Sequence, residues 1–171
     1  MSAQDSKLFV ISGPSGAGKG TLVTRVRERR SNLGLTVSAT TRAPRKGEVD
    51  GVNYFFLTRE EFDRRVANGE FVEWAEVHGN CYGTLVSEVT SKLASGSSLI
   101  LEIDVQGALQ VKERFPEAVL IFIKPPSLEV LRERLVGRGT ETPETIELRM
   151  ANAADELALA CLLYTSDAAD D

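Results

Sequence analysis

A glycine-rich stretch near the amino terminus carries the first chemical signal. Gly13 to Lys19 fits the spacing G-x-x-x-x-G-K and follows an apolar, β-rich run. The backbone N–H groups of such a loop can converge on one anion, and the lysine adds a mobile positive charge for the outer phosphates. The stretch therefore predicts a loop that binds the phosphates of a nucleoside triphosphate. Its residues are Gly13, Pro14, Ser15, Gly16, Ala17, Gly18, Lys19, Gly20 and Thr21.

The residue after the lysine bears on the kind of reaction. This motif has Ser or Thr there as a Mg²⁺ ligand, but the chain has Gly20, and Thr21 comes one place later. A GTPase with firmly held Mg²⁺ needs that ligand, whereas a transferase can hold Mg²⁺ mainly through phosphates and water. Gly20 therefore favours phosphoryl transfer between two nucleotides, with Thr21 near the metal. The alternative is a structural turn with an exposed lysine, which the position after an apolar strand disfavours.

Two arginines and two tyrosines form a second set. Arg42 and Arg45 supply planar guanidinium forks, which match the oxygens of a phosphate monoester. The hydroxyls of Tyr54 and Tyr82 can donate to the same phosphate. Each of these residues has an ordinary interpretation as a core or surface residue, but together they predict a monophosphate site.

The base of that monophosphate is suggested by three further residues. Guanine presents two donors, N1–H and the 2-amino group, on one edge, and the carboxylate of Glu73 can accept both while repelling the N1 acceptor of adenine. Ser38 and Thr84 can donate to guanine O6. A site that pairs its substrate in this way rejects an unmatched base strongly.

The segment from residue 40 to 56 reads T-T-R-x-P-R-x-G-E-x-x-G-x-x-Y-x-F, and with Glu73 it resembles the guanylate kinases. The resemblance runs from about Leu8 to Ala160. It implies transfer of the γ-phosphoryl group of ATP to GMP or dGMP, with Mg²⁺. It also implies an α/β fold of the P-loop NTPase type, with a parallel sheet core flanked by helices, an inserted mixed β GMP-binding subdomain and a helical lid.

The resemblance assigns further roles by position. Asp104 would lie beside GMP and the metal region, and Arg134, Arg138 and Arg149 would close over the transferring phosphoryl group and ATP. The predicted catalytic residues are Lys19, Arg42, Arg138 and Arg149. For Arg134, a surface salt bridge is an equally good interpretation. The attacking GMP oxygen is already anionic, so no general base is required.

Apolar runs that alternate with helical patterns must position these residues. They predict a mostly parallel sheet covered on both faces, within one domain. The expected parts are a core (about 7–37, 89–125 and 148–160), an insert (about 38–88) and a lid (about 126–147). Leu35 to Arg42 is predicted to be a single strand.

The bulk properties restrict the other possibilities. The chain has 171 residues and a formal net charge of −5, which argues against general nucleic-acid binding. The first residues lack an apolar signal core, and no apolar run has the length of a membrane span. We expect a cytoplasmic protein whose partners are small nucleotides.

The last residues, 161–171, do not follow the family pattern, and we expect an atypical tail. This leaves as alternatives a truncated enzyme or a catalytically weak or inactive guanylate-kinase-like binding module. A kinase of another monophosphate and a P-loop ATPase are weaker alternatives because Glu73 and the arginines argue against both.

Overall fold

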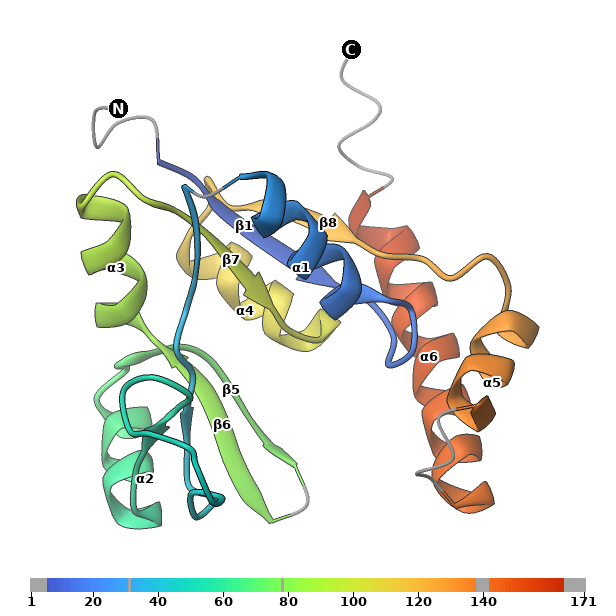
Figure 1. Cartoon of the computed structure of the whole chain (residues 1–171), viewed down its shortest axis with the longest axis horizontal. Coiled ribbons are helices and arrows are strands. Elements are labelled where there is room, and N and C mark those ends of the chain that lie inside the picture. Colours follow the sequence, from blue (N-terminus) through green and yellow to red (C-terminus); the bar gives the residue numbers. More distant parts are fainter. Residues whose placement is uncertain (1–5, 31, 78, 138–141, 165–171) are drawn as a thin grey trace.

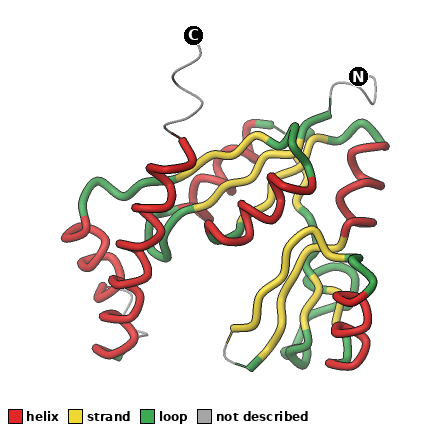
Figure 2. Tube along the Cα trace, turned by 180° about the vertical axis from the view of Figure 1, so that it is seen from behind, coloured by secondary structure: helices red, strands yellow, loops and turns green. Residues whose placement is uncertain are grey.

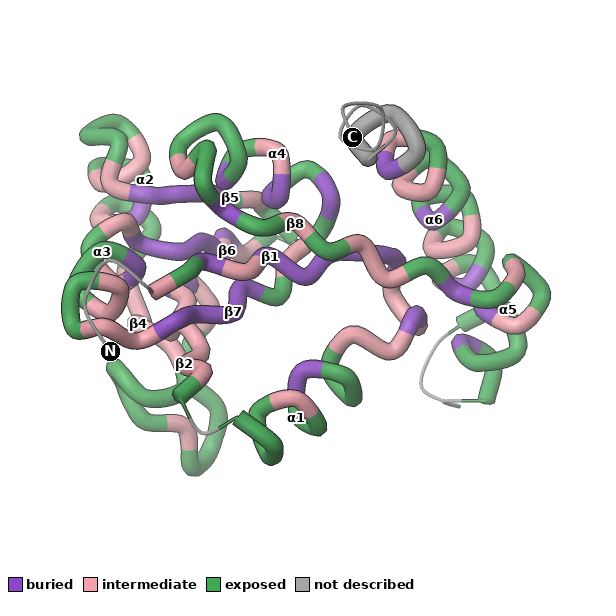
Figure 3. The backbone as a smooth tube through the Cα atoms, turned by 90° about the horizontal axis from the view of Figure 1, so that it is seen from above, coloured by how far each residue is buried: buried purple, intermediate pink, exposed green. Residues whose placement is uncertain are grey.

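A parallel four-stranded sheet forms the centre of the larger part of the molecule. The computed structural model of the chain describes residues 6–30, 32–77, 79–137 and 142–164. The strand order is β2 (Leu33–Leu35), β7 (Ser98–Glu102), β1 (Leu8–Ser12) and β8 (Val119–Phe122). Within this sheet, the buried residues lie in β1 and β7, whereas those of β2 and β8 are half-buried or exposed (Figure 3). Because both faces of β1 and β7 are covered, successive residues on both faces are apolar, which gives each strand a continuous apolar run.

Helices cover both faces of this sheet (Figure 1). On one face, α3 (Val86–Ala94) and α4 (Val105–Arg114) pack against alternate residues of β1 and β7. On the other face, α1 (Lys19–Arg29) packs through Val23. The remaining pair, α5 (Leu128–Gly137) and α6 (Pro143–Tyr164), shares a separate apolar cluster. Among the described residues, none of these helices combines the length and apolar character of a membrane span.

A second sheet forms the insert, which we define as residues 38–88. Its strand order is β4 (Phe55–Phe56), β3 (Ala39–Thr40), β6 (Asn80–Leu85) and β5 (Phe71–Val77), with α2 (Arg59–Ala67) packed against it. The Thr58 hydroxyl accepts from the Glu61 N–H at 3.1 Å and caps α2. Figure 2 shows the two groups of strands as separate bodies.

The prediction of one strand from Leu35 to Arg42 is wrong. The chain leaves the core sheet at Leu35 and enters the insert sheet at Ala39. Between the sheets, α3 satisfies the backbone: Lys92 donates to the Leu35 carbonyl at 2.9 Å, and Glu88 accepts from Val37 N–H at 2.9 Å. Since both strands are short and the residues between them also have β-forming types, a continuous β-rich pattern hides the change of sheet.

Candidate active site

The loop between β1 and α1, residues 13–21, is called here the phosphate loop. Its first glycine is required by close packing, because a Cβ on Gly13 (φ +140°) would lie 2.4 Å from the Ile123 carbonyl oxygen. Gly18 adopts a left-handed conformation (φ 103°) and directly precedes the first turn of α1. Glycine reaches this conformation without strain, so the loop can present backbone N–H groups at the start of the helix.

Three cationic side chains from three helices meet the phosphate loop. Lys19 donates to the carbonyl oxygens of Gly13 and, at 3.1 Å, Pro14. Arg149 on α6 donates to the Ser15 hydroxyl. Arg134 on α5 donates to the Ala17 carbonyl oxygen at 3.3 Å. Three cationic side chains therefore surround the loop, as the binding of a polyphosphate requires.

Cavities lie on both sides of the loop. One, of about 320 Å³, is lined by Lys19, Gly20, Thr21 and Glu102 together with the preceding loop residues. The other, of about 600 Å³, lies against α1 and α5 and includes Arg134. A Cβ on Gly20 would lie 3.7 Å from a carboxylate oxygen of Glu102. Thr21 and Glu102 thus give the first cavity hard oxygen donors, which suit Mg²⁺.

The arginine set lies in the insert. One guanidinium nitrogen of Arg42, Nη2, donates to both carboxylate oxygens of Glu48, at 2.9 and 3.0 Å, and Nη1 donates to the Ala43 carbonyl oxygen at 2.7 Å. Its guanidinium also stacks over Tyr54, 5.4 Å from the ring centroid. Arg42 lowers the pKa of the Glu48 carboxyl, and the backbone N–H of Arg45 adds to this effect. Glu48 therefore orients Arg42 and closes the turn that carries Arg45.

Tyr82 and Tyr54 lie edge to face, with ring centroids 6.3 Å apart. This contact brings the tyrosine from β6 to the same corner of the insert as Tyr54 and, through it, Arg42. Arg45 is exposed and donates its backbone N–H to Glu48 at 2.7 Å. The four residues predicted to hold a monophosphate are therefore grouped in the structure.

Glu73 and Thr84 face each other on β5 and β6. The Thr84 hydroxyl donates to Glu73 Oε1 at 2.7 Å, and both residues are buried. Burial raises the pKa of the Glu73 carboxyl; the Thr84 hydrogen bond opposes this shift, while the charge of Asp104 reinforces it. Asp104 itself caps α4 by accepting from Gly107 N–H at 2.7 Å. A buried carboxylate is costly unless it is paired or used, so Glu73 is a strong candidate for ligand recognition.

Comparison with known proteins decides which family shares this arrangement. A sequence model described as guanylate kinase matches residues 5–167. The chain belongs to the guanylate kinase family. It is 58% identical to the guanylate kinase of Gloeobacter violaceus over 155 residues, which cover 91% of this chain and 76% of that relative. It is 55% identical to the guanylate kinase of Halalkalibacterium halodurans over 159 residues, covering 93% and 78%.

A solved structure agrees with the family assignment. The crystal structure of guanylate kinase from Anaplasma phagocytophilum matches with a TM-score of 0.65 and 40% identity, over 90% of this chain and 71% of that one. The expected fold class and the expected nucleoside monophosphate kinase activity of the guanylate kinase family are both confirmed. Guanylate kinases use ATP as phosphoryl donor, generally with Mg²⁺.

The predicted site residues fall into two groups in the structure, one at the phosphate loop and one in the insert. Ser38 is half-buried, and its carbonyl accepts from Phe55 N–H at 2.9 Å. Asp104 lies near Glu73 rather than among the residues that line the Thr21 cavity. Arg138, predicted to be catalytic, lies outside the described residues, as does the tail from residue 165.

Three acidic residues lie at the site without having been predicted as ligands: Glu102 in the Thr21 cavity, Glu48 and Glu156. Glu48 stands within the family pattern quoted above, three residues after Arg45, so its position was a usable signal. No sequence pattern distinguishes Glu156 on α6 from the other acidic residues of that helix, so it could not be predicted. Within the described residues its Oε2 atom is buried without a hydrogen-bond partner. Burial raises the pKa of its carboxyl, Lys19 opposes the shift and Asp104 reinforces it.

Proposed function

We propose that the phosphate loop holds ATP while the insert holds GMP or dGMP. Lys19 and the N–H groups of the loop bind the donor phosphates, and Arg134 and Arg149 neutralise charge on the transferring group. These arginines already donate to loop oxygens, which supports their assignment. Because the contacted oxygens are neutral, phosphate oxygens can replace them as stronger acceptors.

In the acceptor half, Arg42, Arg45, Tyr54 and Tyr82 bind the phosphate of the monophosphate. Glu73 accepts from N1–H and the 2-amino group of guanine, Ser38 donates to O6, and Asp104 lies beside the base. The Thr84 hydroxyl, which donates to Glu73 in the free protein, turns to donate to O6 when the two guanine donors take its place. The buried pairing of Glu73 with Thr84 is the observation that carries this assignment. Adenine lacks the two donors, so its entry would give Glu73 no donor from the base and would set the N1 acceptor of adenine against the carboxylate.

The reaction needs positioning and charge neutralisation rather than a protein base. An oxygen of the GMP phosphate forms a bond to the γ-phosphorus of ATP as the bond from that phosphorus to the β–γ bridging oxygen breaks. ADP and GDP are the products, and no proton must be removed from the nucleophile. Holding both groups in line supplies much of the rate enhancement.

The metal expected for such a reaction fits the residues at the phosphate loop. Thr21 and Glu102 line the same cavity as Lys19, and hydroxyl and carboxylate oxygens suit a hard cation. Bound Mg²⁺ would neutralise phosphate charge. The missing side chain at Gly20 leaves Glu102 facing the start of α1.

A coupled assay of ADP release tests the proposal. With ATP and Mg²⁺ fixed, GMP, dGMP, AMP, CMP and UMP are compared as acceptors. We expect turnover with GMP and dGMP that far exceeds turnover with the other three. If GMP gives no more turnover than AMP, the assignment of the insert as a guanine site fails.

A further inference from the structure

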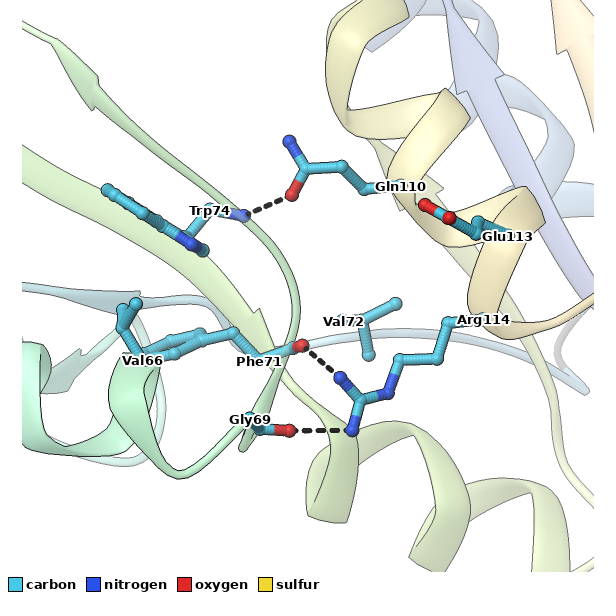
Figure 4. Close-up of a pocket in the computed structure, with 8 residues that line it drawn as sticks. All are labelled: Val66, Gly69, Phe71, Val72, Trp74, Gln110, Glu113 and Arg114. Atoms are coloured by element: carbon cyan, nitrogen blue, oxygen red, sulfur yellow. Dashed lines mark hydrogen bonds between the residues drawn. The ribbon is translucent and has the colours of Figure 1, made fainter.

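The edge of strand β5 lies against helix α4, where the insert meets the core. Arg114 on α4 donates to the carbonyl oxygens of Phe71 at 3.1 Å and Gly69 at 2.6 Å. One turn earlier, Gln110 accepts from Trp74 N–H at 3.3 Å. Figure 4 shows the three hydrogen bonds crossing from α4 to the insert. Since β5 is the last strand of its sheet, these side chains occupy backbone groups that a further strand would otherwise pair.

Strand β5 is irregular at this contact. Phe71 pairs with Leu85, yet Glu73 pairs with Thr84, so β5 carries one extra residue, Val72, relative to β6. In a regular strand, Phe71 and Trp74 would present their backbone groups to opposite edges. The extra residue brings the Phe71 carbonyl and the Trp74 N–H to the same edge, where α4 binds both.

The bulge also decides where side chains point. Phe71 and Trp74 both contact the ring of Phe62, with centroids 4.3 and 6.3 Å away, although an odd number of positions separates them. Val72 instead joins the core cluster beneath the parallel sheet. Glu73 therefore faces away from Phe71 and toward Thr84. Without the bulge, the alternation of the strand would place Glu73 on the Phe71 face.

Two kinds of contact support this junction: Val72 packs in the core cluster with Ala108 and Val111 of α4, and the hydrogen bonds bind the edge of β5. A cavity of about 450 Å³ is lined by Arg114 and Gln110 of α4 and by Phe71, Val72 and Trp74 of β5, among others. Arg114 and Gln110 bridge this hollow, as Figure 4 shows. Removal of either side chain therefore loses its hydrogen bonds to the insert, and the neighbouring side chains do not restore them without a cost in free energy.

We propose that Arg114, assisted by Gln110, is a positioning residue for guanine selection. It holds the bulged segment of β5 against α4 and thereby keeps Glu73 directed at the nucleotide. Arg114 acts through the backbone of β5 and touches neither nucleotide. The inference rests on the proposed function, in which Glu73 reads guanine.

The test compares Arg114→Ala with Lys112→Ala. Lys112 is a matched control because it lies on the same helix and donates to two backbone carbonyls, Pro116 at 2.7 Å and Ala118 at 3.2 Å, away from the insert. The measurements are kcat, KM for ATP, KM for GMP, and the ratio of kcat/KM for GMP to that for IMP, which lacks the 2-amino group.

We expect Arg114→Ala to raise KM for GMP about 10-fold, as loss of charged hydrogen bonds implies, and to lower the GMP-to-IMP ratio. KM for ATP should stay within about 2-fold in both variants, and Lys112→Ala should keep the wild-type ratio. An unchanged ratio in Arg114→Ala overturns the inference, as does an equal loss in Lys112→Ala. If the wild-type protein itself does not prefer GMP, the proposed function has failed instead.

A conservative variant and a spectroscopic signal keep the test decisive if Arg114→Ala does not fold. Lysine at position 114 keeps the charge but lacks the guanidinium fork, so Arg114→Lys should give an intermediate ratio. Trp74 is the chain's single tryptophan and lies at the junction, so its fluorescence reports the position of β5 directly. Arg114→Lys should alter the Trp74 emission without nucleotide, and Lys112→Ala should not. Wild-type emission and ratio in Arg114→Lys would contradict the proposal.

Discussion

The phosphate loop and the insert both collect positive charge, but they do so by different means. The phosphate loop is a run of nine residues whose shape depends on glycine conformations, such as the one that Gly13 adopts against Ile123. The insert collects its polar groups from a turn and several strands between residues 38 and 84. The shape of a site made of consecutive backbone groups is determined by local conformation. A site made of side chains from several strands has its shape only when all of those strands are assembled.

The partners of the cations differ as well. Lys19, Arg134 and Arg149 each donate to a neutral carbonyl or hydroxyl oxygen of the phosphate loop, and the Glu156 carboxylate also attracts Lys19, while Arg42 donates directly to the carboxylate of Glu48. An incoming phosphate competes easily with neutral oxygens. At Arg42 it must share the guanidinium with an existing charge. We infer that electrostatic attraction contributes most to phosphate binding at the phosphate loop. In the insert, the orientation of Arg42 contributes most.

The largest effect is expected from Lys19→Ala. Lys19 is proposed to neutralise the charge of the donor phosphates, which is a major part of phosphoryl-transfer catalysis, so its loss should lower kcat by about 1000-fold. The dissociation constant for GMP, measured by calorimetry without ATP, should stay near the wild-type value. A comparable weakening of GMP binding would show that the two halves are not separable.

Glu73→Gln breaks the acceptor half. We expect kcat/KM for GMP to fall about 100-fold, because the amide presents a donor where guanine also has donors. KM for ATP should not change. Because burial raises the pKa of Glu73, its ionised form costs folding free energy as pH rises through that pKa. Thermal melting at neutral pH should therefore show equal or higher stability in the variant; a lower melting temperature would contradict this account.

Glu48→Gln tests the idea that Arg42 is oriented rather than merely charged. The amide cannot form the charged contact through two carboxylate oxygens or accept as strongly from Arg45 N–H. If orientation dominates, KM for GMP should rise about 5-fold even though net positive charge around the phosphate increases. A lower KM would mean that Glu48 acts mainly by repelling the phosphate. Glu76→Gln, on the exposed part of β5, serves as a control for loss of an acid in the insert.

The smallest effect concerns pH. Only the ionised Glu73 carboxylate can accept from both guanine donors, and its pKa in the free protein is raised. KM for GMP should therefore begin to increase at a pH above the ordinary glutamate range as the solution is acidified, by about 3-fold before the fold is affected. KM for ATP is the internal control. Glu73→Gln should remove this pH dependence, and its persistence would point to another group.

These comparisons separate what could be predicted from the sequence from what could not. Consecutive residues determine the phosphate loop, because local backbone conformation and the start of α1 suffice to build it. The proposal that Glu73 reads guanine also came from the sequence, through the family resemblance together with the match of one carboxylate to two donors. Neither inference required knowledge of which strands are neighbours.

Tertiary structure decided the remainder. The sequence pattern predicted a single strand from Leu35 to Arg42, but in the structure this segment contacts α3 and is divided between two sheets. The contacts of Arg134 and Arg149 with the phosphate loop join residues more than a hundred positions apart. The bulge at Val72, after which Glu73 faces Thr84, lies where α4 binds the free edge of β5. By itself, the sequence determined which chemical groups are available; the long-range packing of helices against sheet edges determined their directions, because no local pattern encodes which edge a distant side chain will reach.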